Sequence, residues 1–207
     1  MSLVSYNARV RPEDVAYFVP RGDGFAAITW RQFDHLTEHA AVQYSRAFQT
    51  DIETSLVAGS QPTVALLGGG NTFRYWVSQI ALLKLGVRVL LLSDKNAETA
   101  REHLLQACNA VGIVVEQKYL LSVQGLDMPI VPCVLISLAW ELEPAAELTR
   151  FNSKDVWNQQ ALIIHSSGST GMPKPIIHTN RSTMLIARMY RLFQSFIVEN
   201  WYLCFPL

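Results

Sequence analysis

The chain has 207 residues, of which 50% are hydrophobic and 16% are charged, so its composition is that of a folded domain with a large apolar core. Its 17 basic and 17 acidic residues cancel, which gives no electrostatic reason to expect a nucleic acid or an anionic membrane as a partner. Its apolar runs fall short of the roughly 20 residues of a membrane span, and the N-terminus has no secretory pattern, so we expect a cytoplasmic protein.

The first 49 residues predict a β-hairpin followed by a long amphipathic helix. Residues 15–19 and 25–28 are apolar and flank turn-forming residues at 20–24. Thr29 is a natural N-cap for a helix over 30–49. Helical spacing places one set of residues on a single face of that helix: Trp30, Phe33, Leu36, Thr37, Ala40, Ala41, Tyr44 and Phe48.

The next part of the chain alternates apolar strands with helices. We expect strands at 64–67, 87–92 and 112–115, helices at 72–85 and 97–109, and a helical turn at 117–123. The strand at 87–92 is apolar almost throughout, which is typical of a strand buried on both faces. This alternation predicts an α/β fold with a mostly parallel sheet flanked by helices.

The C-terminal third is less regular. A strand is expected over 131–138, an acidic surface connection over 141–147, and short strands over 162–164 and 175–178. Thr179 or Asn180 is expected to cap a helix over 182–198. We expect the apolar stripe of that helix to lie in the core: Met184, Leu185, Met189, Leu192, Phe193 and Phe196.

Two groups of side chains were considered as metal ligands. His35 and His39 have i, i+4 spacing but no evident third ligand, so we interpret them as a solvated helix flank. Cys108, Cys133 and Cys204 lack metal-ligand spacing and lie among apolar neighbours, which favours small core residues in a reducing compartment.

The most informative stretch is the loop that follows the strand at 162–164. It is rich in hydroxyls and glycines and ends in Pro173 and Lys174, a composition that suits a polyphosphate. It is no Walker A loop, because two residues rather than four separate Gly168 from Gly171. The other glycine cluster, 68–70, is no dinucleotide fingerprint, since Phe73 stands where a glycine is required.

The segment Ser-Ser-Gly-Ser-Thr-Gly-Met-Pro-Lys at 166–174 resembles the phosphate-loop signature of the adenylate-forming superfamily, which includes acyl-CoA synthetases and luciferases. Two weaker matches to motifs of that superfamily lie upstream in the expected order, at 28–33 and 83–92. With His165 before the loop and Pro175 after the lysine, the chain looks most like adenylation domains of fungal nonribosomal-peptide-synthetase-like enzymes, including carboxylate reductases.

The resemblance implies a reaction and a set of binding residues. Such enzymes use ATP and Mg²⁺ to activate a carboxylic acid, commonly an aryl or keto acid, as an acyl-adenylate. They pass it to the phosphopantetheine thiol of a separate carrier domain. The resemblance assigns the ATP phosphates to the loop residues Ser166, Ser167, Gly168, Ser169, Thr170, Gly171 and Lys174. For His165 two roles stay open, a packing residue or a wall of the acyl pocket.

The chain is much shorter than the large subdomain of that superfamily. We therefore expect residues 1–207 to be a partial adenylation core, the first half of the large N-terminal subdomain, with the remainder of the domain as its partner. The apolar ending at 201–207 also favours a piece of a larger enzyme. The family's catalytic lysine then lies beyond this chain, which we expect to be inactive alone. The alternative is a non-catalytic nucleotide-binding or interaction module.

Overall fold

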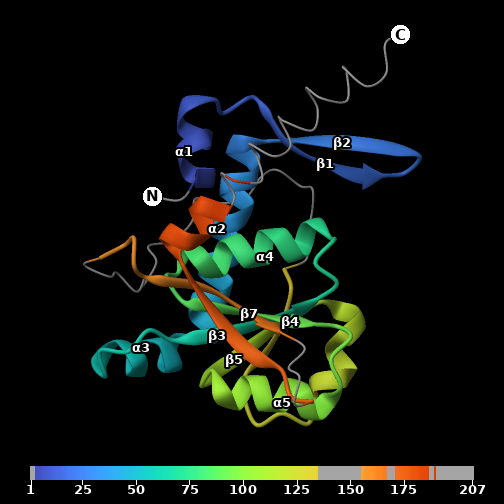
Figure 1. The fold of residues 1–207 in the computed structure, drawn as a ribbon. Helices are drawn as coiled ribbons and strands as arrows, with labels where there is room; N and C mark the ends of the chain where they lie inside the picture. Colours follow the sequence, from blue (N-terminus) through green and yellow to red (C-terminus); the bar gives the residue numbers. More distant parts are fainter. Residues whose placement is uncertain (1–2, 135–154, 167–170, 187–188, 190–207) are drawn as a thin grey trace, which may run out of the picture.

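A six-stranded sheet runs through the middle of the molecule, with helices on both faces (Figure 1). The computed structural model describes residues 3–134, 155–166, 171–186 and 189. The strand order is β6-β5-β3-β4-β7-β8. Neighbouring strands are parallel except β7 and β8, so the predicted α/β fold with a mostly parallel sheet is confirmed. The strands are β3 (Thr63–Gly68), β4 (Arg88–Ser93), β5 (Ala110–Val115), β6 (Ile130–Pro132), β7 (Gln160–Ser166) and β8 (Lys174–Thr179).

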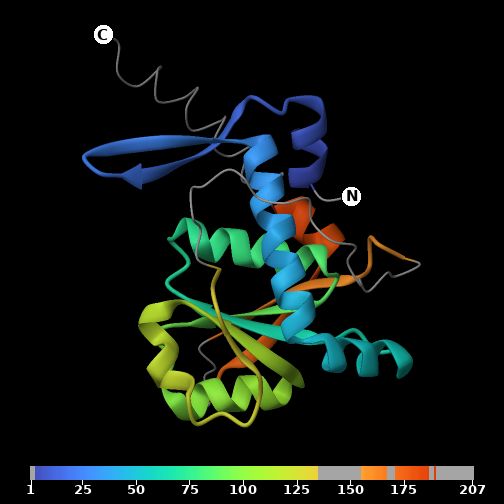
Figure 2. The same ribbon diagram turned by 180° about the vertical axis from the view of Figure 1, so that it is seen from behind.

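The N-terminal part forms the predicted hairpin and helix. Strands β1 (Val15–Arg21) and β2 (Gly24–Thr29) pair in antiparallel fashion and project from the body of the molecule. Thr29 caps α2 (Trp30–Ala47) with a full capping box, because its hydroxyl accepts from Gln32 N–H while the Gln32 side chain accepts from Thr29 N–H. Figure 2 shows α2 running from the hairpin to α3 (Gln49–Val57). Two short helices were not predicted, α3 and α1 (Leu3–Val10).

The remaining helices cover both faces of the sheet, as their apolar spacing predicted. They are α4 (Phe73–Lys84), α5 (Glu98–Ala107) and the 3₁₀ helix η1 (Gln117–Val123). Thr72 caps α4, and the helix ends before Gly86, whose φ of 76° favours glycine. One apolar core lies between the sheet, α2 and α4, and a second lies between the sheet, α5 and η1. Alternate residues of β3 enter the two cores, so Leu66 joins the first and Leu67 the second.

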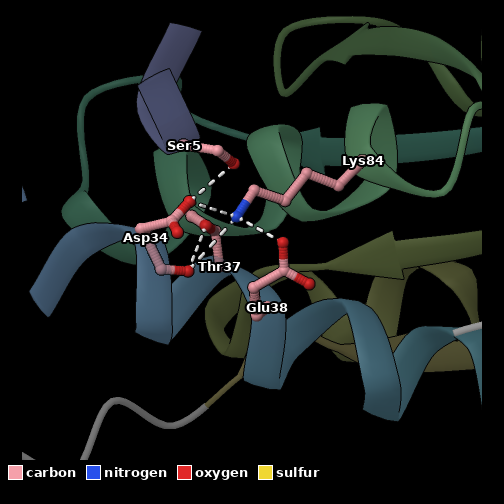
Figure 3. Close-up of polar contacts among 5 residues, drawn as sticks. All are labelled: Ser5, Asp34, Thr37, Glu38 and Lys84. Atoms are coloured by element: carbon pink, nitrogen blue, oxygen red, sulfur yellow. Dashed lines mark hydrogen bonds and ion pairs between the residues drawn. The ribbon is translucent and has the colours of Figure 1, made fainter. Parts of the chain in front are cut away.

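A buried lysine ties α4 to α2 (Figure 3). The Lys84 side chain is 2% exposed, and its Nζ lies 2.7 Å from Asp34 Oδ1 and 2.9 Å from Glu38 Oε1. Ser5 of α1 donates to the same Asp34 oxygen at 2.8 Å, and Thr37 donates to the Asp34 carbonyl. The charge of a lysine at this depth is stabilised because two carboxylates and a carbonyl surround it.

The C-terminal predictions are confirmed in part. Strand β6 ends at Pro132, and the acidic connection at 141–147 lies outside the described residues. Thr179 caps a helix whose described residues are 180–186 and 189. The expected burial of its stripe is wrong for Met184, Leu185 and Met189, which are about half exposed, because the described elements leave this face uncovered. The stripe residues Leu192, Phe193 and Phe196 lie outside the described part.

The cysteine prediction is confirmed where it can be checked. Cys108 and Cys133 are free and buried, and Cys204 lies outside the described residues. Among the helices that the structure describes, none is both long and apolar enough to cross a membrane.

Candidate functional site

The predicted phosphate loop joins β7 to the edge strand β8. In the register of this hairpin, Ser166 is the Cα partner of Lys174, and His165 is the partner of Pro175. The hairpin therefore brings together the first and last residues of the predicted site. The tip residues Ser167, Gly168, Ser169 and Thr170 lie outside the described residues, so their assignment stays a prediction.

The described end of the loop contains a glycine with a positive φ, a buried proline and an exposed lysine. Gly171 has a φ of 89°, a left-handed conformation that an L side chain rarely adopts. Pro173 is buried and begins the return to β8, whereas Lys174 is exposed. A flexible lysine that starts from a fixed strand end can place its ammonium group on a phosphate outside the sheet.

The loop lies at the carboxyl edge of the parallel strands. Strand β7 runs parallel to β4, so Ser166 and the loop after Ser93 meet at the same edge of the sheet. That loop carries Asn96, whose Nδ2 lies 3.1 Å from Nε2 of His165. In open α/β sheets this edge is where ligands bind.

Burial lowers the pKa of His165 below the usual value for an imidazole. Nδ2 of Asn96 lies within hydrogen-bond distance of Nε2 of this ring. Of the loop residues that the structure describes, Lys174 is the one lysine. Sequence reasoning missed Asn96, because the contact joins residues 69 positions apart without any local signal.

The described residues do not gather a metal site. Nowhere in the described ranges do three or more His, Cys, Asp or Glu side chains lie close enough to hold an ion. His39 is within hydrogen-bond distance of Gln43, at 3.1 Å between His39 Nε2 and Gln43 Nε2.

Comparison with known proteins covers nearly the whole chain. The family model of AMP-binding enzymes matches residues 4–206. A carboxylic acid reductase from Neurospora crassa is 29% identical over 153 residues, which are 72% of this chain and 14% of that protein. An adenylate-forming reductase from Aspergillus terreus is 25% identical over an alignment of 208 positions, which covers 87% of this chain and 19% of that protein. The chain thus spans less than a fifth of either relative.

The fold also resembles a solved structure. A fatty acyl-adenylate ligase from L. pneumophila, in complex with acyl adenylate and pyrophosphate, superposes with a TM-score of 0.65 at 16% sequence identity. The match covers 93% of this chain and 32% of that one. At this identity the comparison concerns the fold.

Proposed function

This chain belongs to the AMP-binding enzyme family, and on that premise we propose that it supplies the phosphate-binding loop of an acyl-adenylate-forming enzyme. The observation that carries the proposal is the β7–β8 hairpin, which sets Ser166 opposite Lys174 at the carboxyl edge of the sheet. Hydroxyl and backbone N–H donors at 166–171 suit phosphate oxygens, and Lys174 adds the charge that opposes them.

The proposed reaction is attack of a carboxylate oxygen on the α-phosphorus of ATP. A new P–O bond forms to the acid, the bond to the bridging oxygen breaks, and pyrophosphate leaves with the electron pair. The residues of this chain would bind and orient the β- and γ-phosphates, and Lys174 would offset the charge of the departing pyrophosphate. Mg²⁺, when bound with ATP, would neutralise further phosphate charge.

The finer parts of the proposal concern the substrate and the next step. We infer an aryl or keto acid as the substrate and a phosphopantetheine thiol on a separate carrier domain as the acceptor. The thiolate would attack the acyl carbon and AMP would leave. The name of the Neurospora crassa relative, a carboxylic acid reductase, supports a carboxylic acid as the substrate. Free buried cysteines and the use of ATP support a cytoplasmic location.

Substitution of Lys174 tests the proposal. In the whole protein that carries this chain, we expect Lys174→Ala to lower acid-dependent ATP–pyrophosphate exchange by about 10²-fold, because it removes a charge that acts on the leaving group. The KM for the acid should change little. Arg46→Ala, at an exposed cation in the last turn of α2, is the control and should leave exchange unchanged.

Two outcomes contradict parts of this proposal. Undiminished exchange in the Lys174→Ala variant would remove this lysine from the mechanism. If the whole protein binds ATP but shows no exchange with any of a panel of aryl and keto acids, the chain is a non-catalytic nucleotide-binding module.

A further inference from the structure

The carboxyl end of β7, where the proposed phosphate loop begins, is paired on one side. The register between β4 and β7 ends at the pair of Leu90 with Ile163, whereas β7 continues to Ser166. In the part of the chain that the structure describes, the last three residues of β7 pair with β8 alone. The interior of the sheet therefore supplies no register partner to the residue that begins the loop.

The partner on the other side is limited as well. His165 stands opposite Pro175 of the edge strand β8. A proline has no backbone N–H, so this pair cannot exchange the two hydrogen bonds that an antiparallel pair can form. Side-chain contacts therefore gain importance for the position of this end of β7.

Side chains contact β7 at both of its ends. At the amino end, Gln61 Nε2 donates to the Gln160 carbonyl at 2.6 Å, and Arg88 donates to Gln160 Oε1 at 3.1 Å. At the carboxyl end, Asn96 Nδ2 lies 3.1 Å from His165 Nε2. Asn96 belongs to the connection between β4 and α5, so this contact joins that connection to the residue directly before the loop.

The backbone of Asn96 is held by a turn, and its side chain is not used as a helix cap. The Ser93 carbonyl accepts from Asn96 N–H at 3.2 Å, and Ser93 Oγ accepts from Lys95 N–H at the same distance. The N-cap of α5 is Ala97, which forms no side-chain cap, although asparagine is among the favoured caps and stands one position earlier. Such a departure from a local rule is expected at functional sites.

An amide is suited to hold this ring. It carries both a donor and an acceptor, so it can pair with Nε2 whether or not that nitrogen carries the proton. By the alternation of a strand, His165 lies on the same face as Ile163, which packs in the core beneath α5. The ring is therefore enclosed on the side from which Asn96 approaches.

We propose that Asn96 is a positioning residue of the adenylation site. Through His165 it fixes the place of Ser166 and, across the hairpin, that of Lys174. This inference rests on the proposed function of the loop. Because groups that bind a reacting substrate must be held closely in place, a small displacement of the loop should weaken its hold on the ATP phosphates.

Substitutions in the whole protein that carries this chain test the contact. Asn96→Leu keeps the approximate size of the side chain but cannot form a hydrogen bond. We expect it to raise the KM for ATP in ATP–pyrophosphate exchange about three- to tenfold and to leave the KM for the acid unchanged, since a single hydrogen bond is lost. A merely structural role would lower the amount of active protein without changing either KM.

Substitutions of His165 show whether Asn96 acts through this ring. His165→Leu should also raise the KM for ATP, and the double variant with Asn96→Leu should be no weaker than His165→Leu alone. His165→Gln restores an amide that Asn96 can meet, so its KM for ATP should stay near that of the wild type.

The exposed flank of α2 offers a matched control. Gln43 Nε2 lies 3.1 Å from His39 Nε2, which is the same kind of contact at the same distance. Gln43→Leu removes it far along the chain from the loop, and both KM values should stay at their wild-type levels.

Hydrogen exchange without ATP separates this inference from the proposed function. Asn96→Leu and His165→Leu should each speed deuterium uptake by the backbone amides of β8 at least about threefold and leave β3 unchanged. Unchanged uptake in β8, an unchanged KM for ATP in Asn96→Leu, or additive effects in the double variant would each overturn the inference. A wild-type protein without ATP–pyrophosphate exchange would contradict the proposed function, and the uptake in β8 would then decide by itself whether Asn96 fixes the hairpin.

Discussion

His165 shows how partial burial of a side chain affects its charge next to the proposed phosphate loop. Its ring is partly buried, so the neutral form is favoured in the folded state. The residue stands directly before Ser166 in β7. A neutral ring there supports packing at the strand end.

The lowered pKa of His165 predicts a pH dependence of the free energy of unfolding. Because its folded pKa is lowered, the unfolded chain binds the proton more tightly, and stability is lost as pH falls below about 6.5 toward the folded pKa. His165→Gln should remove this part of the acid destabilisation. Urea denaturation at pH 7.5 and pH 5.5 measures it: the free energy of unfolding should fall more in the wild type than in the variant. An equal fall in both would show that His165 does not titrate as described.

Helices α2 and α4 are joined by charge as well as by apolar packing. Lys84 comes from the last turn of α4, and both carboxylates come from α2, so the ion pairs hold the two helices in one relative position. Asp34 and Glu38 keep about a fifth to a quarter of their side-chain surface exposed, which allows solvent to screen them partly. The lysine itself is almost fully buried, so its removal leaves two carboxylates without their cation.

Removal of that cation should destabilise the chain. We expect Lys84→Met to lower the free energy of unfolding by about 2–3 kcal/mol, less than a fully buried pair because of the solvent screening. The control is Arg31→Gln, which breaks the exposed pair with Glu13 and should cost at most about 0.5 kcal/mol. Chemical denaturation of both variants provides the comparison, and equal effects would mean that burial of Lys84 adds nothing.

The molecule as a whole is organised by β3. All six residues of this strand are buried, and it pairs with β4 on one side and β5 on the other. Because its side chains alternate between the two apolar cores, it couples the layer of α2 and α4 to the layer of α5 and η1. We therefore expect the two layers to unfold together.

Substitutions on opposite faces of β3 test this coupling. Leu66→Ala and Leu67→Ala each empty a fully buried position, and each should lower the free energy of unfolding by about 2–5 kcal/mol. Within each variant, tryptophan fluorescence and far-UV circular dichroism should give the same midpoint. Leu121→Ala, at a side chain that is 80% exposed, is the control and should have little effect. Separate midpoints for the two probes would show that the layers unfold independently.

Much of the fold was predictable because its signals are local. The capping residue Thr29, the apolar strands and the glycine that ends α4 each act through neighbours within a few positions. The hairpin, most helices and the mostly parallel sheet were therefore predicted correctly. The loop at 166–174 was recognisable for the same reason, since its residues are contiguous. Helices α1 and α3 are only eight and nine residues long, and they were missed.

The sequence by itself determined most of the elements, the α/β class and the family, because spacing, caps and a contiguous motif are readable along the chain. Only the tertiary structure decided that Asn96 meets His165, that Lys84 is buried between two acids, and that Glu116 accepts a hydrogen bond from Gly69 N–H. These contacts join residues 47 to 69 positions apart. The exposure of Met184 and Leu185 is a further feature that only the tertiary structure decided. An apolar stripe shows which face of a helix favours burial, but it does not show which element packs against that face.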